Sequence, residues 1–239
     1  MRHLIRTKHT IPAILAVGAL TVAALVIAPL LTLHHHGSAS PTPSPSPTTS
    51  PTPSPSGAVT LVKGSHAVDG IEVGYPHTTV GAISAAVQYL DAAESTLDPD
   101  YAASVIRLVG DPANASLSAN FATSTVDLRA DLKLPTTGPL PAPIAFQTTA
   151  AMFQARDDAA DSLLVLVLAS GTYTNGQGGI AQTTGVFPLR MHWVDGDWRL
   201  AAVGGDGHDY SPLNVNPYTS EAAARGWLPL VSSFGGDAP

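Results

Sequence analysis

The sequence predicts an α+β domain in which three N-terminal helices pack on a curved, four-stranded antiparallel sheet. Two observations predict this class. Between residues 79 and 133 the apolar positions recur every three or four residues, whereas from residue 144 onward they alternate with period two. The first period is typical of amphipathic helices and the second of strands. A run of helices followed by a run of strands indicates an α+β domain with the helices on one face of the sheet.

The N-terminal part of the chain carries the pattern of a membrane anchor. Residues 11–33 are 23 residues without a charge, and a helix of that length covers roughly 35 Å, enough to cross a bilayer core. Residues 1–10 contain Arg2, Arg6 and Lys8 and no acidic residue. Basic flanks stay in the cytoplasm. We therefore expect a cytoplasmic tail (1–10), a transmembrane helix (11–33) and a single-pass protein of the cell membrane with its bulk outside.

A cleaved signal peptide is the alternative interpretation of this segment. The apolar core of a signal peptide has about 7–15 residues and ends in a small-residue cleavage site. Residues 11–33 are longer than that, although Ser-Ala-Ser at 38–40 resembles such a site. The length of the segment therefore favours an uncleaved anchor.

Residues 34–58 are expected to be a disordered linker. Prolines alternate with Ser and Thr along most of this segment, a composition that cannot bury apolar surface and that favours extended polyproline II. An extracytoplasmic domain is then expected over residues 59–230, followed by a flexible tail at 231–239. A stalk that lifts the domain off the membrane is one interpretation of this linker, and a disordered tether with no partner is the favoured one.

The charge and the cysteine content exclude several kinds of function. The chain has 11 Lys and Arg against 18 Asp and Glu, and three of the basic residues belong to the tail, so the rest of the chain is strongly acidic. An acidic domain repels phosphate backbones, and we expect no direct binding of nucleic acid. Because the chain has no Cys, disulfides, thiol catalysis and cysteine metal sites are excluded.

The first structural element expected in the domain is a short hairpin, followed by a helix. Asp69-Gly70 lies between apolar positions and is a turn dipeptide. Thr78 or Thr79 can cap the helix that follows. Its core-facing positions are three and four residues apart: Val80, Ile83, Val87 and Leu90.

Two further helices are predicted to begin at an acidic cap followed by a proline. Asp98-Pro99 and Asp111-Pro112 both show this pattern, in which the carboxylate accepts from free amides and the proline takes the first helical position. The second helix should end before Gly110 and the third before Pro135. Their expected core positions are Tyr101, Val105, Leu108, Leu117, Phe121, Leu128 and Leu132.

Four strands are predicted after the proline-rich break at residues 135–143. Residues 144–152 alternate, and residues 163–169 are apolar on both faces, which indicates a central strand covered on each side. Asp195-Gly196 is a two-residue hairpin turn that makes Trp193 and Trp198 cross-strand neighbours. One face of the last two strands should meet the helices: Phe187, Leu189, Met191, Trp193, Trp198 and Leu200.

Helical residues 79–133 and the block 191–200, Met-His-Trp-Val-Asp-Gly-Asp-Trp-Arg-Leu, resemble the cone-shaped nuclear transport factor 2-like fold. The resemblance covers residues 78–204 and is architectural. It implies a curved sheet that closes around a cavity, and by itself it does not define a function.

A second resemblance rests on Gly74-Tyr75-Pro76-His77-Thr78, on Gly81-Ala82, Ala85-Ala86 and Tyr89, and on Gly226-Trp227-Leu228-Pro229. These residues resemble a family of uncharacterised actinobacterial membrane-anchored proteins, many of them associated with integrative conjugative elements. With the anchor, the layout resembles the bitopic assembly subunits of type IV secretion and conjugation machines. That resemblance implies a scaffold role, although those subunits lack a linker of this length.

The sequence shows no catalytic motif, so we predict no enzymatic activity, no cofactor and no metal. His34-His35-His36 is better explained as a polar boundary of the membrane segment, and Asp206-Gly207-His208-Asp209 lacks the closing Glu of a calcium loop. His77 would be a base only if it opened onto a cavity. Its position between Pro76 and Thr78 favours a turn residue that packs the first helix.

Three functions are left open by these observations. The first is an accessory or scaffold subunit of a cell-envelope complex, most simply in conjugative DNA transfer, with envelope proteins as partners and self-association left open. The second is a small-molecule-binding protein or enzyme that uses the cone cavity, and the third is an adhesion or immunity module facing the cell wall. The candidate cavity or motif residues are Gly74, Tyr75, Pro76, His77, Thr78, Trp193, Trp198 and Trp227.

Overall fold

The computed structural model describes residues 57–140, 142–155, 161–204 and 207–232. The predicted tail, transmembrane helix and nearly all of the linker, residues 1–56, lie outside the described residues, as do residues 233–239. None of the helices that the structure does describe combines the length and the apolar character that a membrane crossing requires.

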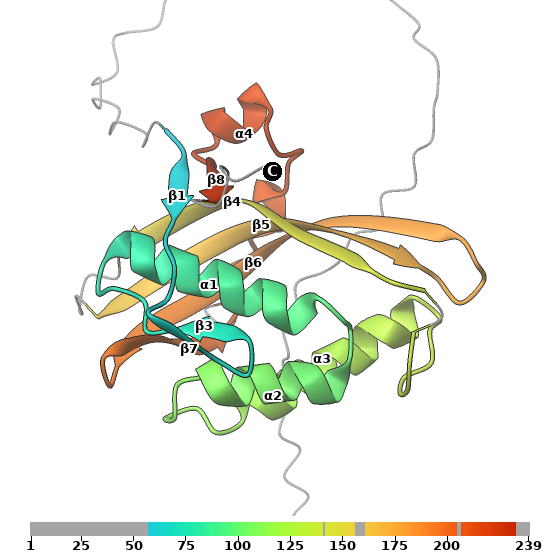
Figure 1. Ribbon diagram of the computed structural model, residues 1–239. Coiled ribbons are helices and arrows are strands. Elements are labelled where there is room, and N and C mark those ends of the chain that lie inside the picture. The colour runs from blue at the N-terminus through green and yellow to red at the C-terminus, as the bar shows by residue number, and fades with distance from the viewer. Residues whose placement is uncertain (1–56, 141, 156–160, 205–206, 233–239) are drawn as a thin grey trace, which may run out of the picture.

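A six-stranded mixed sheet forms the centre of the described chain (Figure 1). Its strand order is β1-β8-β4-β5-β6-β7, in which β1 runs parallel to β8 and the other neighbours are antiparallel. A separate two-stranded ladder joins β2 to β3. The strands are β1 (Val59–Leu61), β2 (His66–Val68), β3 (Ile71–Val73), β4 (Ala145–Ala155), β5 (Ser162–Thr174), β6 (Ile180–Val194), β7 (Asp197–Val203) and β8 (Leu228–Ser232).

Helices cover both faces of this sheet, but to different extents (Figure 1). On one face α1 (Thr79–Glu94) lies across the strands, α2 (Pro99–Val109) packs beside α1, and α3 (Leu117–Asp131) packs on α2. On the other face lie η1 (Ser211–Leu213) and α4 (Ser220–Ala224). Alternate residues of β5 enter the two apolar cores, so the prediction of a central strand covered on each side is confirmed.

The predicted fold, a four-stranded antiparallel cone of the nuclear transport factor 2-like type with three N-terminal helices, is wrong. The strands β1 and β8 come from opposite ends of the domain and extend the sheet beyond β4 with a parallel pair. In addition, β1, β2 and β3 precede α1. The strands β1 and β8 are three and five residues long. Such short segments show no periodicity of their own, and only long-range pairing makes them strands.

The strip of side chains expected on the helix-facing side of the sheet is confirmed, but it belongs to the packed core. Leu189, Met191 and Leu200 are buried against α1. They therefore do not line a cone cavity, on which the small-molecule alternative depended. Val80 and Tyr101 were expected in the core and are exposed; each lies in the first turn of its helix.

A β-bulge overturns the predicted alternation in β4. The register of β4 with β5 shifts at Thr149, and a bulge of one residue exchanges the two faces of a strand. Before the bulge, Phe146 packs on the α1 side of the sheet. After it, Ala151 takes the α1 side, whereas Ala150 and Met152 pack on the opposite side.

Both Asp-Gly hairpins are confirmed. Asp69-Gly70 has φ values of 52° and 83°, and Asp195-Gly196 has φ values of 53° and 81°. Positive φ at both central positions is characteristic of the type I′ turn, whose twist matches that of the strands. The second turn pairs Trp193 with Trp198, as expected.

Two of the three predicted helix caps are confirmed. Thr78 Oγ1 accepts a hydrogen bond from the amide of Gly81, and Asp98 Oδ1 accepts from two amides in the first turn of α2. The cap predicted at Asp111 is wrong, because α3 begins only at Leu117. Oδ2 of the Asp111 carboxylate instead contacts His192 in the sheet, and Oδ1 accepts from the Ala113 amide in the loop before α3.

Candidate functional site

The segment Gly74–Thr78 is the turn that leads from β3 into α1, and hydrogen bonds attach it to β7. The amide of Tyr75 donates to Oδ1 of Asp197 at 3.0 Å, and Nε1 of Trp198 donates to the Pro76 carbonyl at 3.0 Å. The hydroxyl of Tyr89 donates to the Trp198 carbonyl. Because Asp197 is buried, this turn is held by bonds that solvent does not weaken.

Gly74 of this segment and Gly81 of α1 both occupy positions where a side chain would collide with a neighbour. Gly74 has a φ of 74°, in the region that favours glycine, and a Cβ there would overlap the Ser65 hydroxyl. Gly81 lies in α1, and a Cβ on it would overlap the carbonyl of Pro76. That same carbonyl accepts a hydrogen bond from Trp198 Nε1. The segment Gly74–Thr78 therefore positions the start of α1 against β7.

His77 lies on the surface of this turn, stacked on a tryptophan. Its ring is parallel to that of Trp193 within 8°, with the ring centroids 4.2 Å apart. Its Nε2 lies 2.9 Å from Oδ1 of Asp161, and the two side chains are 44% and 51% exposed. We call Pro76, His77, Asp161 and Trp193 the His77 surface. Asp157 and Asp158, which precede Asp161 closely in the sequence, lie outside the described residues.

The structure brings together seven of the eight residues singled out from the sequence and separates the eighth. The first seven, Gly74 to Thr78 with Trp193 and Trp198, lie around the start of α1. Trp227 packs instead in the apolar cluster on the opposite face of the sheet, where its Nε1 donates to the Leu213 carbonyl at 3.0 Å. Its role in the described domain is to attach the C-terminal segment.

A second ion pair joins the loop after α2 to β6. Nδ1 of His192 lies 2.9 Å from Oδ2 of Asp111. Desolvation raises the pKa of Asp111, but the hydrogen bonds from His192 and from the Ala113 amide outweigh it and hold the pKa below its ordinary value. This pair engages one oxygen of Asp111 with the sheet, where a helix cap had been expected.

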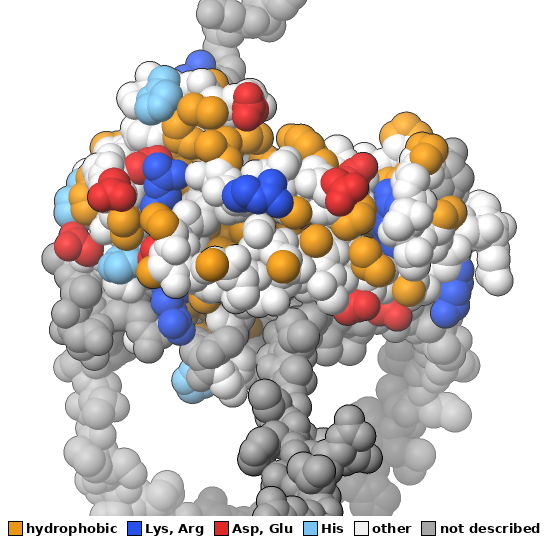
Figure 2. Space-filling view, turned by 90° about the horizontal axis from the view of Figure 1, so that it is seen from below, with side chains coloured by type: hydrophobic (Ala, Val, Ile, Leu, Met, Phe, Trp, Pro, Cys, Tyr) orange, Lys and Arg blue, Asp and Glu red, His pale blue; other side chains and the backbone are white. Residues whose placement is uncertain are grey.

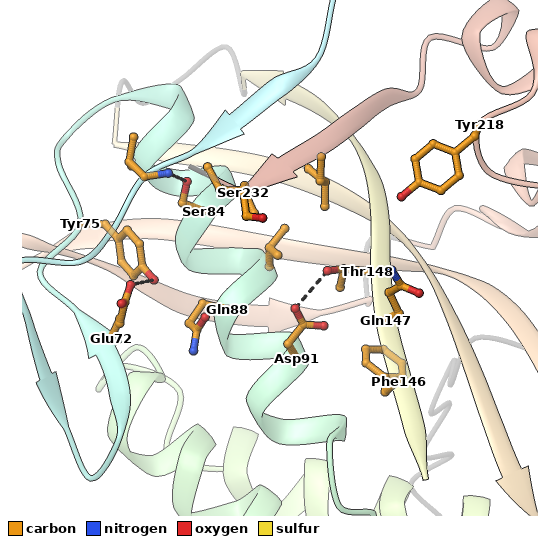
Figure 3. Close-up of a pocket in the computed structure, with 14 residues that line it drawn as sticks. Glu72, Tyr75, Ser84, Gln88, Asp91, Phe146, Gln147, Thr148, Tyr218 and Ser232 are labelled. Atoms are coloured by element: carbon orange, nitrogen blue, oxygen red, sulfur yellow. Dashed lines mark hydrogen bonds between the residues drawn. The ribbon is translucent and has the colours of Figure 1, made fainter. Parts of the chain in front are cut away.

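A pocket that the sequence did not reveal opens between α1, β3, β4 and the β1–β8 edge (Figure 3). Its volume is about 370 Å³, within the usual range for small-ligand sites. The side chains that line it come from several elements: Leu61, Val62, Glu72, Tyr75, Ser84, Val87, Gln88, Asp91, Phe146, Gln147, Thr148, Tyr218, Leu230 and Ser232.

Asp91 is the most unusual residue of this pocket. Thr148 Oγ1 donates to its Oδ2 at 3.0 Å, while its Oδ1 is buried without a hydrogen-bond partner among the described residues. Burial raises the pKa of Asp91 to about 6, against the smaller opposing effect of Thr148. Across the pocket Glu72 Oε2 accepts from the Gly64 amide and from the Tyr75 hydroxyl.

One sequence signal could have indicated this pocket. Ser84, Gln88 and Asp91 are four and three residues apart, which places them on one face of a helix. The rest of that helix is nearly all buried apolar residues. A polar row on an otherwise buried helix predicts a polar cavity, but the partner strands could not be named from the sequence.

A separate carboxyl on α1 leads to a testable pH dependence of stability. Burial raises the pKa of Glu94 to about 7, so the unfolded chain releases this proton at a lower pH than the folded domain. Stability should then fall as pH rises from about 4.5 to 7. We expect Glu94→Gln to raise the free energy of unfolding by about 1–3 kcal/mol at pH 8 and to change it little at pH 4.

Urea unfolding of the two proteins at both pH values measures this difference. Glu221→Gln is the matched control, because Glu221 is 62% exposed and should change stability by less than about 0.5 kcal/mol. An equal effect of Glu94→Gln at pH 4 and pH 8 would contradict the assignment.

The described residues form no group of three or more His, Asp or Glu side chains that could hold a metal. The candidates His34-His35-His36 and Asp206 lie outside those residues. Asp209, the last residue of the second candidate, accepts a hydrogen bond through Oδ1 from the Ser211 amide at the start of η1.

Comparison with known proteins gives a family match. A family model described as "Domain of unknown function (DUF8175)" matches residues 64–222, about two thirds of the chain. No curated protein sequence matches. A crystal structure of the intermembrane space region of the chloroplast protein ARC6 is similar over 53% of this chain and 92% of that chain, with 12% identity and a TM-score of 0.32. A likeness that weak carries no argument about fold or function.

Proposed function

Because the chain belongs to the DUF8175 family, a family of unknown function, we propose its function from its own residues. It is a non-enzymatic, membrane-anchored accessory or scaffold subunit of a cell-envelope complex. It works through protein–protein contacts of the domain at residues 59–230. Residues 11–33 anchor it in the membrane as a single-pass protein, with the tail in the cytoplasm and the domain outside.

The observation that supports contact with a protein partner most directly is the His77 surface. His77, which is 44% exposed, stacks there on the partly buried Trp193, beside a carboxylate that is 51% exposed. Aromatic side chains are enriched at the energetic centres of interfaces. These rings are also held in place, because Pro76 and Tyr75 are bonded to β7, and a rigid surface loses little entropy on binding.

The process that we propose is conjugative, type IV secretion-like DNA transfer, with other envelope proteins of the transfer complex as partners. The support is the resemblance of the Gly74–Thr78 segment and of the anchored layout to conjugation-associated proteins. The partner is a protein rather than the transferred DNA, because the chain is acidic. On the face that carries α2 and α3, basic and acidic side chains lie interspersed and form no basic tract (Figure 2).

Affinity purification of the tagged, full-length chain from a detergent extract tests this function. We expect envelope proteins to be recovered with the wild type, and at least tenfold less of them with His77→Ala, a loss of about 1.4 kcal/mol in binding. The matched control is His66→Ala, since His66 is also an exposed histidine, on β2, and should retain the partners. Thermal unfolding would verify that both variants are folded.

Asp161→Asn provides a second variant of the same surface, because it removes the carboxylate that faces His77 without truncating a ring. Recovery of the wild type with no envelope protein, and DNA transfer unchanged in a deletion strain, would contradict the proposal. Equal recovery with the His77 and His66 variants would contradict the assignment to the His77 surface.

A further inference from the structure

The pocket between α1, β4 and the β1–β8 edge has a one-sided charge. Glu72 and Asp91 are its charged lining residues, and no Lys or Arg is among the side chains that line it. The two carboxylates stand on different elements, β3 and α1. Figure 3 shows Gln88 between them and Thr148 beside Asp91. This arrangement would repel an anion and attract a cation.

We propose that this pocket binds a small organic cation through a primary ammonium group, and that Asp91 is its main acceptor. This inference goes beyond the scaffold function, since it concerns a different surface from the His77 surface. It rests on the charge of the pocket, on an unpartnered oxygen within it and on the aromatic side chains at its walls.

The unpartnered oxygen is the strongest part of the argument. Within the described part of the chain, Oδ1 of Asp91 is buried without a hydrogen-bond donor, although Oδ2 accepts from Thr148. Leaving such an acceptor unsatisfied is costly in free energy, and more so for a charged group. An ammonium group has three donors and no acceptor. It would give Oδ1 a charge-assisted hydrogen bond and compensate the carboxylate charge at the same time.

The aromatic walls suit the rest of such a ligand. Tyr75, Phe146 and Tyr218 line the pocket together with Val87 and Leu230. Ring faces attract cations, and they also pack against alkyl chains. Tyr218 is 67% exposed and has a φ of 60°, an uncommon conformation for a residue with a side chain. Because this exposed ring lines the pocket, a bound ligand can contact it.

Neutral and metal ligands fit the pocket less well. A diol could donate to Oδ1 but would leave the charges of Asp91 and Glu72 uncompensated. Hard metal ions need about six oxygen ligands, and the described residues form no metal-ligand group.

An ammonium ligand also implies a pH dependence. The titratable groups that line the pocket are Glu72, Tyr75, Asp91 and Tyr218, and the pKa of Asp91 is about 6.

Titration of the full-length chain in detergent with pentane-1,5-diamine tests the proposal, with pentane-1,5-diol as the neutral probe of equal length. Binding is followed by the NMR shifts of the Gln88 and Gln147 amides. We expect the diamine to bind at least tenfold more tightly than the diol at pH 7.5. We expect about tenfold weaker diamine binding at pH 5, where Asp91 is mostly protonated.

Asp91→Asn should weaken diamine binding at least tenfold at pH 7.5, while Asp100→Asn, at an exposed carboxylate of α2, should change it less than twofold. Equal affinity for the diamine and the diol would overturn the proposal. So would a diamine affinity that changes neither between pH 7.5 and pH 5 nor on Asp91→Asn. If Asp91→Asn does not fold, the comparison of the two probes on the wild type still decides. His77→Ala should leave diamine binding unchanged, so this test and that of the scaffold function fail separately.

Discussion

Replacing Arg129 by Met is expected to lower the free energy of unfolding by about 3–5 kcal/mol. Arg129 is 1% exposed and lies near the end of α3. Its Nε donates to the Leu97 carbonyl at 2.6 Å, and its two terminal nitrogens donate to the carbonyls of Pro135 and Gly138 at 3.0 and 2.9 Å. Methionine fills similar volume but leaves the buried Leu97 carbonyl without a donor, at a cost of about 1–3 kcal/mol, and it also removes the part-buried hydrogen bonds to Pro135 and Gly138.

The three carbonyls belong to two loops that nothing in the local sequence joins. Leu97 is buried with a φ of 48°, an uncommon conformation in the loop between α1 and α2. Its carbonyl accepts the hydrogen bond that Arg129 Nε donates. Pro135 and Gly138 belong to the segment between α3 and β4. Loss of the guanidinium should therefore loosen both connections of the α2–α3 pair.

Urea unfolding of the full-length chain in detergent, followed by tryptophan fluorescence, measures the effect. Arg107→Met is the matched control, because Arg107 is an exposed arginine on α2 and should cost less than about 0.5 kcal/mol. Equal stability of the two variants would show that the hydrogen bonds of Arg129 do not stabilise the domain.

Gly81→Ala is expected to destabilise the domain by about 2–4 kcal/mol, although alanine favours helices over glycine by about 1 kcal/mol. The added Cβ would overlap the Pro76 carbonyl, and backbone cannot move aside as a flexible side chain can. That carbonyl is held by Trp198 Nε1 and by the Thr78 amide. Helix propensity therefore predicts that this methyl group stabilises the domain, whereas packing predicts that it destabilises the domain.

The sign of the stability change on Gly81→Ala decides between helix propensity and packing. Thermal unfolding of the wild type and of Gly81→Ala gives it directly, and Val80→Ala, at the exposed preceding position of α1, is the control, with a change of less than about 1 kcal/mol. An increase in stability on Gly81→Ala would mean that α1 can shift away from Pro76, and that the glycine of the motif has no packing role.

The candidate site was accessible from the sequence only in part. The motif Gly74–Thr78 and the Trp193–Trp198 pair were singled out correctly as neighbours of the first helix, because a turn dipeptide fixes which residues face each other across a hairpin. The pocket around Asp91 was missed. Its walls come from β1, β3, β4, β8 and α1, and no short stretch of sequence contains more than a few of its residues.

Trp227 illustrates the same limit. Its motif at the end of the domain suggested that it belongs with the motif at the start. The β1–β8 pair does bring the two ends of the domain together, but the Trp227 ring enters the core on the other face of the sheet. Which face a side chain takes depends on strand register, and a shift of one residue reverses it.

The sequence by itself determined the local elements of this protein: the helices through their apolar period, two caps and two type I′ hairpins through turn and cap chemistry, and the central strand through its apolar run. Each of these depends on residues within a few positions of one another. The tertiary structure alone decided the six-stranded order, the bulge at Thr149, the buried network of Arg129 and the unpartnered oxygen of Asp91. Those features arise from contacts between distant segments, whose free energy appears only once the chain has folded.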